Sequence, residues 1–132
     1  MSLSPTMDVT IRMARENREI AKAVFRAAAE EAKIETREMR ARTPVDTGAL
    51  VETVRDEIDE DAMAIKWMAG GDGVDYAVEV HENLEAFHPR GQARFISSVM
   101  EEAAAYLGAR IATRARRILE ASGAFARLVK VR

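Results

Sequence analysis

The chain is predicted to change direction at residues 42–50, which read Arg42-Thr43-Pro44-Val45-Asp46-Thr47-Gly48-Ala49-Leu50. Proline disfavours helical geometry in the residue before it and lacks a backbone donor, so a helix arriving from the N-terminal side should stop here. The Asp46 carboxylate is placed to accept backbone N–H groups two residues on, and Gly48 adopts positive φ at little cost. These residues predict a fixed corner over 43–50 that contains no reactive group.

A long helix is predicted before this corner, from Asp8 to about residue 42. Asp8 sits where an N-cap or first-turn acid stabilises a helix. Charged residues such as Arg26 and Glu30 are spaced to pair on the other faces, and Ala27-Ala28-Ala29 allows a second helix to approach closely. The apolar stripe is formed by Met13, Ile20, Ala27 and Ile34, and is widened by Val24, Phe25, Ala28 and Ala32.

The length of this helix has two explanations. At 1.5 Å per residue it measures about 45–50 Å, which exceeds the core that a chain of 132 residues builds. Part of its stripe must therefore be buried by the sheet and second helix of the same chain, or by another copy. Burial by another copy would be a first indication of an assembly protein.

After the corner, the pattern changes to short apolar segments and turns. A helical turn over 48–51 followed by a strand over 52–58 is favoured, although the apolar residues of 50–58 also recur every four positions. Residues 63–68 alternate with period two, which is typical of a half-buried strand. The two strands are expected to pair as a hairpin over about 52–69.

The remaining segments lead to a second long helix. Residues 74–82 fit either a strand or one to two helical turns, and residues 83–92 read as a loop. A helix is predicted over about 94–121, in which Gly108 costs roughly 1 kcal/mol relative to alanine and is tolerable where a close neighbour gains from it. Residues 122–132 begin with a helix stop, Ser122-Gly123, and continue as an edge strand, a docked arm or a disordered end. The helical stripe comprises Ile96, Met100, Ala103, Leu107, Ile111, Ala115 and Ile118.

Size and composition set broad limits. A length of 132 residues predicts a single domain over 1–132. The net charge of −2 argues against a purely electrostatic nucleic-acid binder, and the absence of cysteine excludes disulfides and thiolate metal sites. No apolar run approaches the ~18 residues of a membrane span. Residues 1–6 lack the order of a secretion signal and are left out of the predicted fold. A soluble, intracellular protein is expected.

The histidines raise the question of a metal site. His81 and His88 lie among acidic residues, and His81 with Glu82 begins like a zincin motif, but no second histidine stands at the fifth place. Hydrogen-bonding or packing roles are therefore favoured. The glycine-rich residues 70–73 lack the lysine and spacing of a phosphate loop, and no serine or paired acids are arranged for hydrolysis. We expect no catalytic residue, no cofactor and no metal.

Charge is distributed unevenly along the chain. An acidic region at 52–61 and a basic region from Arg110 onward give electrostatic complementarity that steers copies or partners. The basic region also fits a solvated helix face or contact with a nucleic-acid backbone, but no aromatic residues interleave with its arginines for base stacking. The candidate interface residues are Arg110, Arg114, Arg117 and Arg127.

Three segments, in this order, resemble one protein family. Residues 43–50 resemble the T-P-V-D-T-G-x-L segment of the minor tail and minor capsid proteins of long-tailed bacteriophages, the head–tail joining and tail-completion group. Residues 76–84 resemble its Y-A-x-x-V-H-E element, and residues 88–96 its H-P-x-G-Q-A-K-F-L element. The chain departs from the family pattern at two places. Arg94 stands where the family usually has lysine, and residues 51–54 stand where it usually has an arginine-serine-isoleucine run. The matching positions include Thr43, Pro44, Asp46, Thr47, Gly48 and Leu50, then Tyr76, His81, Glu82, His88, Pro89, Gly91 and Phe95.

The resemblance implies a non-enzymatic virion component of a phage or prophage, located at the neck or head-proximal tail and present in the host cytoplasm during assembly. Its implied partners are itself and other phage head, neck or tail proteins, commonly in rings, with no membrane. Nucleic acid bound through the basic C-terminal segment is the alternative. The implied fold is α+β, with the long N-terminal helix and the C-terminal helix packed on a small antiparallel β-sheet. We expect the corner to fix the angle between first helix and sheet, with Tyr76, His81 and Phe95 holding the loop against it.

Overall fold

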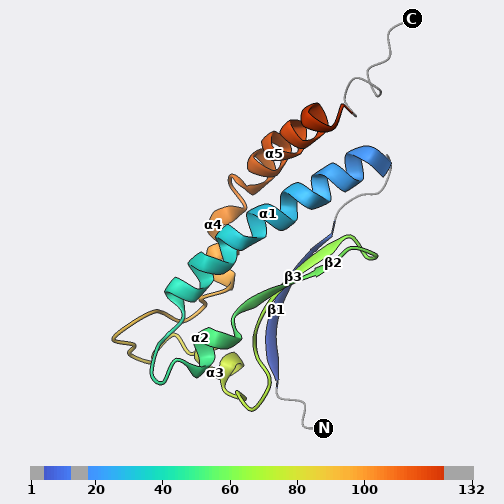
Figure 1. Ribbon diagram of the computed structural model, residues 1–132. Helices are drawn as coiled ribbons and strands as arrows, with labels where there is room; N and C mark the ends of the chain where they lie inside the picture. The colour runs from blue at the N-terminus through green and yellow to red at the C-terminus, as the bar shows by residue number, and fades with distance from the viewer. Residues whose placement is uncertain (1–4, 13–17, 124–132) are drawn as a thin grey trace, which may run out of the picture.

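The computed structural model describes residues 5–12 and 18–123, which form an α+β fold. In Figure 1, α1 lies between α5 and a three-stranded sheet, and the short helices α2 and α3 lie together at one end. No helix in the described ranges has the length and apolarity needed to cross a bilayer. The elements in chain order are β1 (Thr6–Arg12), α1 (Arg18–Arg42), α2 (Ala49–Thr53), β2 (Arg55–Asp59), β3 (Ala64–Gly70), α3 (Ala77–Glu82), α4 (Ser97–Ala103) and α5 (Leu107–Ser122).

The sheet is antiparallel in the order β1-β3-β2. The expected hairpin is confirmed, because β2 pairs with β3 with Ile58 opposite Ile65. Trp67 on the central strand is buried, and its Nε1 lies 3.5 Å from the Ala32 carbonyl oxygen of α1. One face of the sheet thus packs on α1 and forms the main core.

The prediction that the first helix begins at Asp8 is wrong. Residues 6–12 are strand β1, which pairs with β3 so that Val9 lies opposite Trp67. Thr6 lies outside the fold predicted from the sequence, but it is the first residue of this strand. Asp8 therefore caps no helix; its carboxylate lies 3.9 Å from the Lys66 ammonium. Met13 lies outside the described residues.

Helix α1 ends at Arg42, as Pro44 predicts, and is buried on two sides. Phe25, Ala28 and Ala32 pack in the core on the sheet side. Ala23 and Ala27 pack against Ala115 and Leu119 of α5, which confirms the expected close helix approach. Ile20, placed in the predicted stripe, is 42% exposed, so that assignment is wrong. Because its own sheet and α5 bury α1, the length of this helix gives no reason to invoke a second copy.

The short elements largely follow the predictions. The helical turn expected at 48–51 is α2, which continues to Thr53, so the strand expected at 52–58 begins only at Arg55, as β2. The undecided segment 74–82 contains helix α3. Residues 83–92 contain neither helix nor strand, as expected for a loop.

The C-terminal helix predicted over 94–121 is two helices. Helix α4 ends at Ala103 and α5 starts at Leu107, with Tyr106 N–H bonded to the Ala103 carbonyl at 3.0 Å in the turn between them. A Cβ at Gly108 would meet nothing within 4 Å, so no close neighbour explains that glycine. Gly123 has φ +75 and ends α5, as the Ser122-Gly123 pair predicts.

Candidate functional site

The loop after α3 returns to the corner that follows α1. A Cβ at Gly91 would stand 2.5 Å from the backbone nitrogen of Pro44 and from the carbonyl carbon of Thr43. The Gln92 N–H donates to the Arg42 carbonyl at 2.7 Å. The corner and the loop, which are separated by some forty residues in the sequence, therefore meet backbone to backbone.

The corner has its own internal bonds. The buried Thr43 hydroxyl donates to the Met39 carbonyl at 2.6 Å, and Gly48 has the expected positive φ of +88. The Ala49 N–H donates a hydrogen bond to the Thr47 hydroxyl oxygen at 3.3 Å. Asp46 was expected to bond this backbone, but it is exposed and its carboxylate has no hydrogen bond within the described part of the chain.

His81 is fully buried behind the loop, and both of its ring nitrogens are occupied. Nε2 accepts the Ser97 N–H at 3.2 Å, so Nδ1 carries the proton that is donated to Glu82 at 2.8 Å. The ring meets Phe95 edge to face, with centroids 5.0 Å apart. The Arg94 N–H donates to the His81 carbonyl at 2.7 Å. His81 therefore joins α3 to the start of α4, as a packing and hydrogen-bonding histidine.

The three side chains expected to hold the loop against the corner have different surroundings. His81 and Phe95 touch, but Tyr76 stands at the start of α3 with 38% of its surface exposed. His88 is half-buried, and its Nε2 has no hydrogen-bond partner among the described residues. The loop meets the corner through Gly91 and Gln92, whereas His81 and Phe95 join α3 to the segment before α4.

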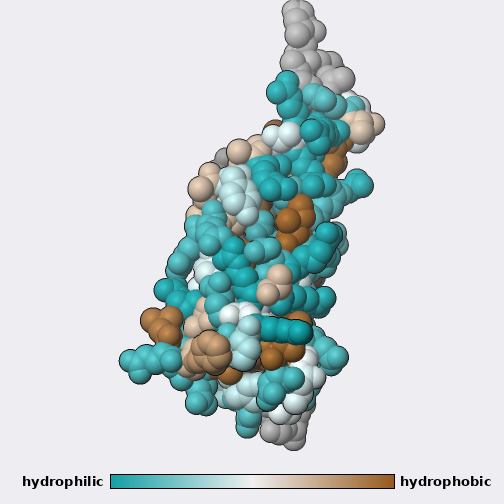
Figure 2. All heavy atoms as spheres, turned by 90° about the vertical axis from the view of Figure 1, so that its left-hand side faces the viewer, coloured by the Kyte–Doolittle hydropathy of each residue, from teal (hydrophilic) through white to brown (hydrophobic). Residues whose placement is uncertain are grey.

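Two large apolar side chains protrude from this junction; we call Leu84 and Phe87 the apolar tip. They are 73% and 87% exposed. The turn that carries them is fixed, because Asn83 Oδ1 accepts the N–H groups of Glu85 at 3.1 Å and Ala86 at 3.2 Å. Figure 2 shows apolar side chains gathered at this end of the molecule, below a mainly hydrophilic surface.

Sequence analysis missed the apolar tip. Pro89, Gly91 and their polar neighbours predict a loop over 83–92 and do not indicate which of its side chains project into solvent. Leu84 and Phe87 are the two large apolar residues in that segment, and their presence within a predicted surface loop is the sequence signal that points to them.

The basic residues of α5 are used inside the chain. Arg114 lies 2.8 Å from Glu31 and 3.2 Å from Glu30, and Arg110 lies 3.3 Å from Glu31. Glu31 is almost fully buried, so these arginines compensate a carboxylate between α1 and α5. Of the other candidate interface residues, Arg117 is exposed and Arg127 lies outside the described residues.

Glu35, one turn further along α1, is also buried. Burial raises the pKa of its carboxyl group, and the neighbouring charge of Glu31 acts in the same direction, while Arg110 opposes both. Its Oε1 has no hydrogen-bond partner among the described residues. This carboxyl is therefore costly to ionise in the folded protein.

On the sheet side of α1, Asp56 has the opposite shift. Burial disfavours its ionised form, but hydrogen bonds from Lys33 and from the Thr36 hydroxyl, the latter at 2.6 Å, outweigh burial and lower the pKa of the Asp56 carboxyl. Asp56 thus fixes β2 to α1.

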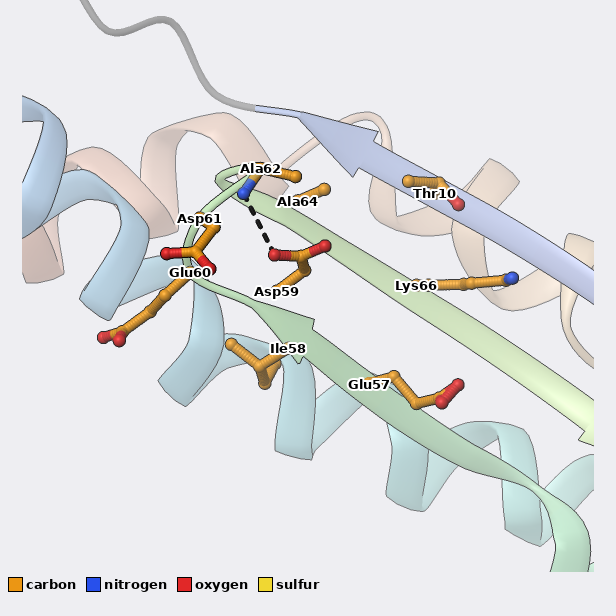
Figure 3. Close-up of a pocket in the computed structure, with 9 residues that line it drawn as sticks. All are labelled: Thr10, Glu57, Ile58, Asp59, Glu60, Asp61, Ala62, Ala64 and Lys66. Atoms are coloured by element: carbon orange, nitrogen blue, oxygen red, sulfur yellow. Dashed lines mark hydrogen bonds between the residues drawn. The ribbon is translucent and has the colours of Figure 1, made fainter.

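The acidic hairpin turn borders a shallow hollow on the outer sheet face. Figure 3 shows Asp59, Glu60, Asp61 and Lys66 around it, with the Asp59 carboxylate accepting the Ala62 N–H at 3.0 Å. Within residues 5–12 and 18–123, no group of three or more histidine, cysteine or acidic side chains is arranged to hold a metal ion. None of the unpartnered buried polar atoms among the described residues lines this hollow, so nothing there indicates a ligand.

Comparisons of this chain with known protein families, curated proteins and solved structures find no match.

Proposed function

We propose that this chain is a structural virion component of a phage or prophage, which acts at the neck or head-proximal tail by protein–protein assembly through the apolar tip. The observation that carries the proposal is the exposure of Leu84 and Phe87 on a turn with fixed geometry. Exposed large apolar side chains on a rigid base are typical of protein-binding sites, because little conformational entropy is lost when they become buried.

The positions of the resemblance motifs support the same proposal. The corner, the His81 segment and the segment from His88 to Ile96 are separate in sequence, and all three contribute to the base of the tip. The residues that carry the resemblance to the phage family therefore hold the exposed tip in place, which supports the proposal.

Nucleic-acid binding through α5 has less support. Arg110 and Arg114 are engaged with Glu31 and Glu30, so phosphate contact would compete with intramolecular ion pairs. Fluorescence anisotropy with a labelled DNA duplex at two salt concentrations separates the two functions. Tight binding with steep salt dependence would favour the nucleic-acid alternative.

The virion location has a direct test. Peptides of this chain are expected in particles purified from the phage or induced prophage that encodes it, as detected by mass spectrometry. Particles with Phe87→Ser should lose the protein, whereas Ile20→Ser, which alters an exposed apolar residue on α1, should leave it incorporated. Intact wild-type particles without the protein would overturn the proposal.

A further inference from the structure

We propose that the apolar tip of one copy binds the groove between α1 and the β2–β3 hairpin of a second copy. This inference rests on the proposed function and adds to it the identity of one partner surface. It predicts a head-to-tail contact between different surfaces of identical chains.

The groove has an apolar floor. Its volume is about 1020 Å³, and it is lined on the α1 side by Ala21, Phe25 and Ala29, and on the hairpin side by Ile58 and Met63. Ile58 is 39% exposed there. An aromatic ring and a leucine side chain entering from another molecule would cover this surface, and burial of apolar area would stabilise the contact.

The charges at the rim give the contact a direction. The α1 wall carries the exposed basic residues Arg18, Lys22 and Arg26, whereas the hairpin wall carries Glu60 and Asp61. A ligand with acidic groups on one side and a basic group on the other therefore fits in one orientation.

The tip has this arrangement of charges. Glu82 precedes Leu84, Glu85 lies between Leu84 and Phe87, and Arg90 follows Phe87, all with exposed side chains. When the tip lies in the groove with its acidic side against α1, Arg90 faces the acidic hairpin wall. The tip thus offers acidic groups to the basic wall of the groove and a basic group to its acidic wall.

The positions of tip and groove exclude a contact within one molecule. In Figure 1 the loop between α3 and α4 lies towards the end of the molecule that holds α2 and α3, whereas the N-terminal end of α1 and the turn of the β2–β3 hairpin lie at the other end. Both surfaces belong to every copy, so each bound chain leaves one tip and one groove available. Repetition of such a contact generates a ring, or a filament if the rotation does not close.

A mixing experiment tests the inference. Phe87→Ser removes the tip and retains the groove, whereas Ile58→Asp disrupts the groove and retains the tip. In light scattering and native mass spectrometry, wild-type protein is expected to form concentration-dependent oligomers, and each variant alone should associate at least tenfold more weakly. An equimolar mixture should form a 1:1 dimer and nothing larger, because one intact tip and one intact groove remain.

A second pair of variants avoids the sheet, since Ile58 lies in β2. Lys22→Glu and Glu85→Lys alter exposed residues; each alone should weaken association, and their mixture should restore a dimer. If Phe87→Ser abolishes association while Ile58→Asp and Lys22→Glu leave it unchanged, the tip binds elsewhere and this inference is overturned. A wild-type chain that stays monomeric at millimolar concentration also overturns it, yet the proposed function stands if virions contain the protein.

Discussion

Gly91 lies directly against the backbone of Thr43, with no room for a side chain between them. A Cβ on Gly91 would stand 2.5 Å from the Thr43 carbonyl carbon and 2.6 Å from its oxygen. The φ of Gly91 is +82, a conformation that side-chain-bearing residues rarely adopt. Because the obstructing atoms are backbone, neither a rotamer change nor a small shift relieves the overlap. This contact joins the loop that carries the apolar tip to the end of α1.

Gly91→Ala is expected to lower the free energy of unfolding by roughly 2–4 kcal/mol, because it combines backbone strain with steric overlap. Gly73→Ala is the matched control. Its φ of +87 is similar, but a Cβ there meets nothing within 4 Å, so it should cost only about 1–2 kcal/mol. Urea denaturation followed by circular dichroism measures both. Equal losses for the two variants would show that the Thr43 contact does not constrain the loop.

Glu35→Gln is expected to make the protein less sensitive to alkaline pH. Burial raises the pKa of Glu35 in the folded state. The stability associated with protonated Glu35 is therefore fully present below the ordinary glutamate pKa and is lost as pH rises through the raised value. Glutamine does not ionise, so the stability of the variant relative to wild type should increase from pH 4 to pH 8.

Thermal melting across this range measures the effect. Glu79→Gln, at an exposed position on α3, serves as the control and should change melting temperature equally at both ends of the range. A constant difference between Glu35→Gln and wild type would argue that burial does not perturb Glu35.

The elements with strong local signals were predictable from the sequence. Pro44 marked the end of α1, and the alternation through Trp67 identified β3, since both signals lie within a few residues. Strand β1 was missed because the residues after Asp8 also fit a helical repeat. The alternation of Met7, Val9 and Ile11 has meaning only beside β3, more than fifty residues away.

Other features had no local signal. The apolar stripe continues at helical spacing across residues 104–106, and nothing in their residue types explains why α4 and α5 are separate. The junction at Gly91 was visible as a motif, but its contact with Thr43 depends on how the loop returns to the corner. The exposure of Phe87 follows from that return and therefore needed the structure.

Asp56→Asn is expected to destabilise the protein at neutral pH by about 1.5–3 kcal/mol, the typical contribution of hydrogen bonds to a charged group. The carboxylate accepts from Lys33 and from Thr36, and its pKa is lowered in the folded state. Such a group contributes stability above the ordinary aspartate pKa and loses it as pH falls through the lowered value. The difference between variant and wild type should thus shrink between pH 5 and pH 2, as followed by urea denaturation. A difference that is independent of pH would contradict the charged hydrogen bonds.

Arg114→Ala is expected to destabilise the packing of α5 on α1. The guanidinium compensates the buried Glu31 carboxylate at 2.8 Å and also contacts Glu30 at 3.2 Å. Its removal leaves Arg110 as the remaining cation within 4 Å of Glu31 among the described residues, at 3.3 Å. Loss of this guanidinium should cost clearly more stability than loss of an exposed arginine, because the buried Glu31 carboxylate loses part of its compensation.

Arg117→Ala is the matched control on the same helix, since Arg117 is exposed and makes no ion pair within the described residues. It should change stability by less than about 0.5 kcal/mol. Urea denaturation of both variants, with anisotropy of a DNA duplex measured in parallel, separates a structural role from phosphate binding. If Arg114→Ala keeps wild-type stability and weakens DNA binding, α5 serves nucleic acid. If it loses stability and neither the wild-type protein nor either variant binds DNA, Arg114 serves to hold α5 on α1.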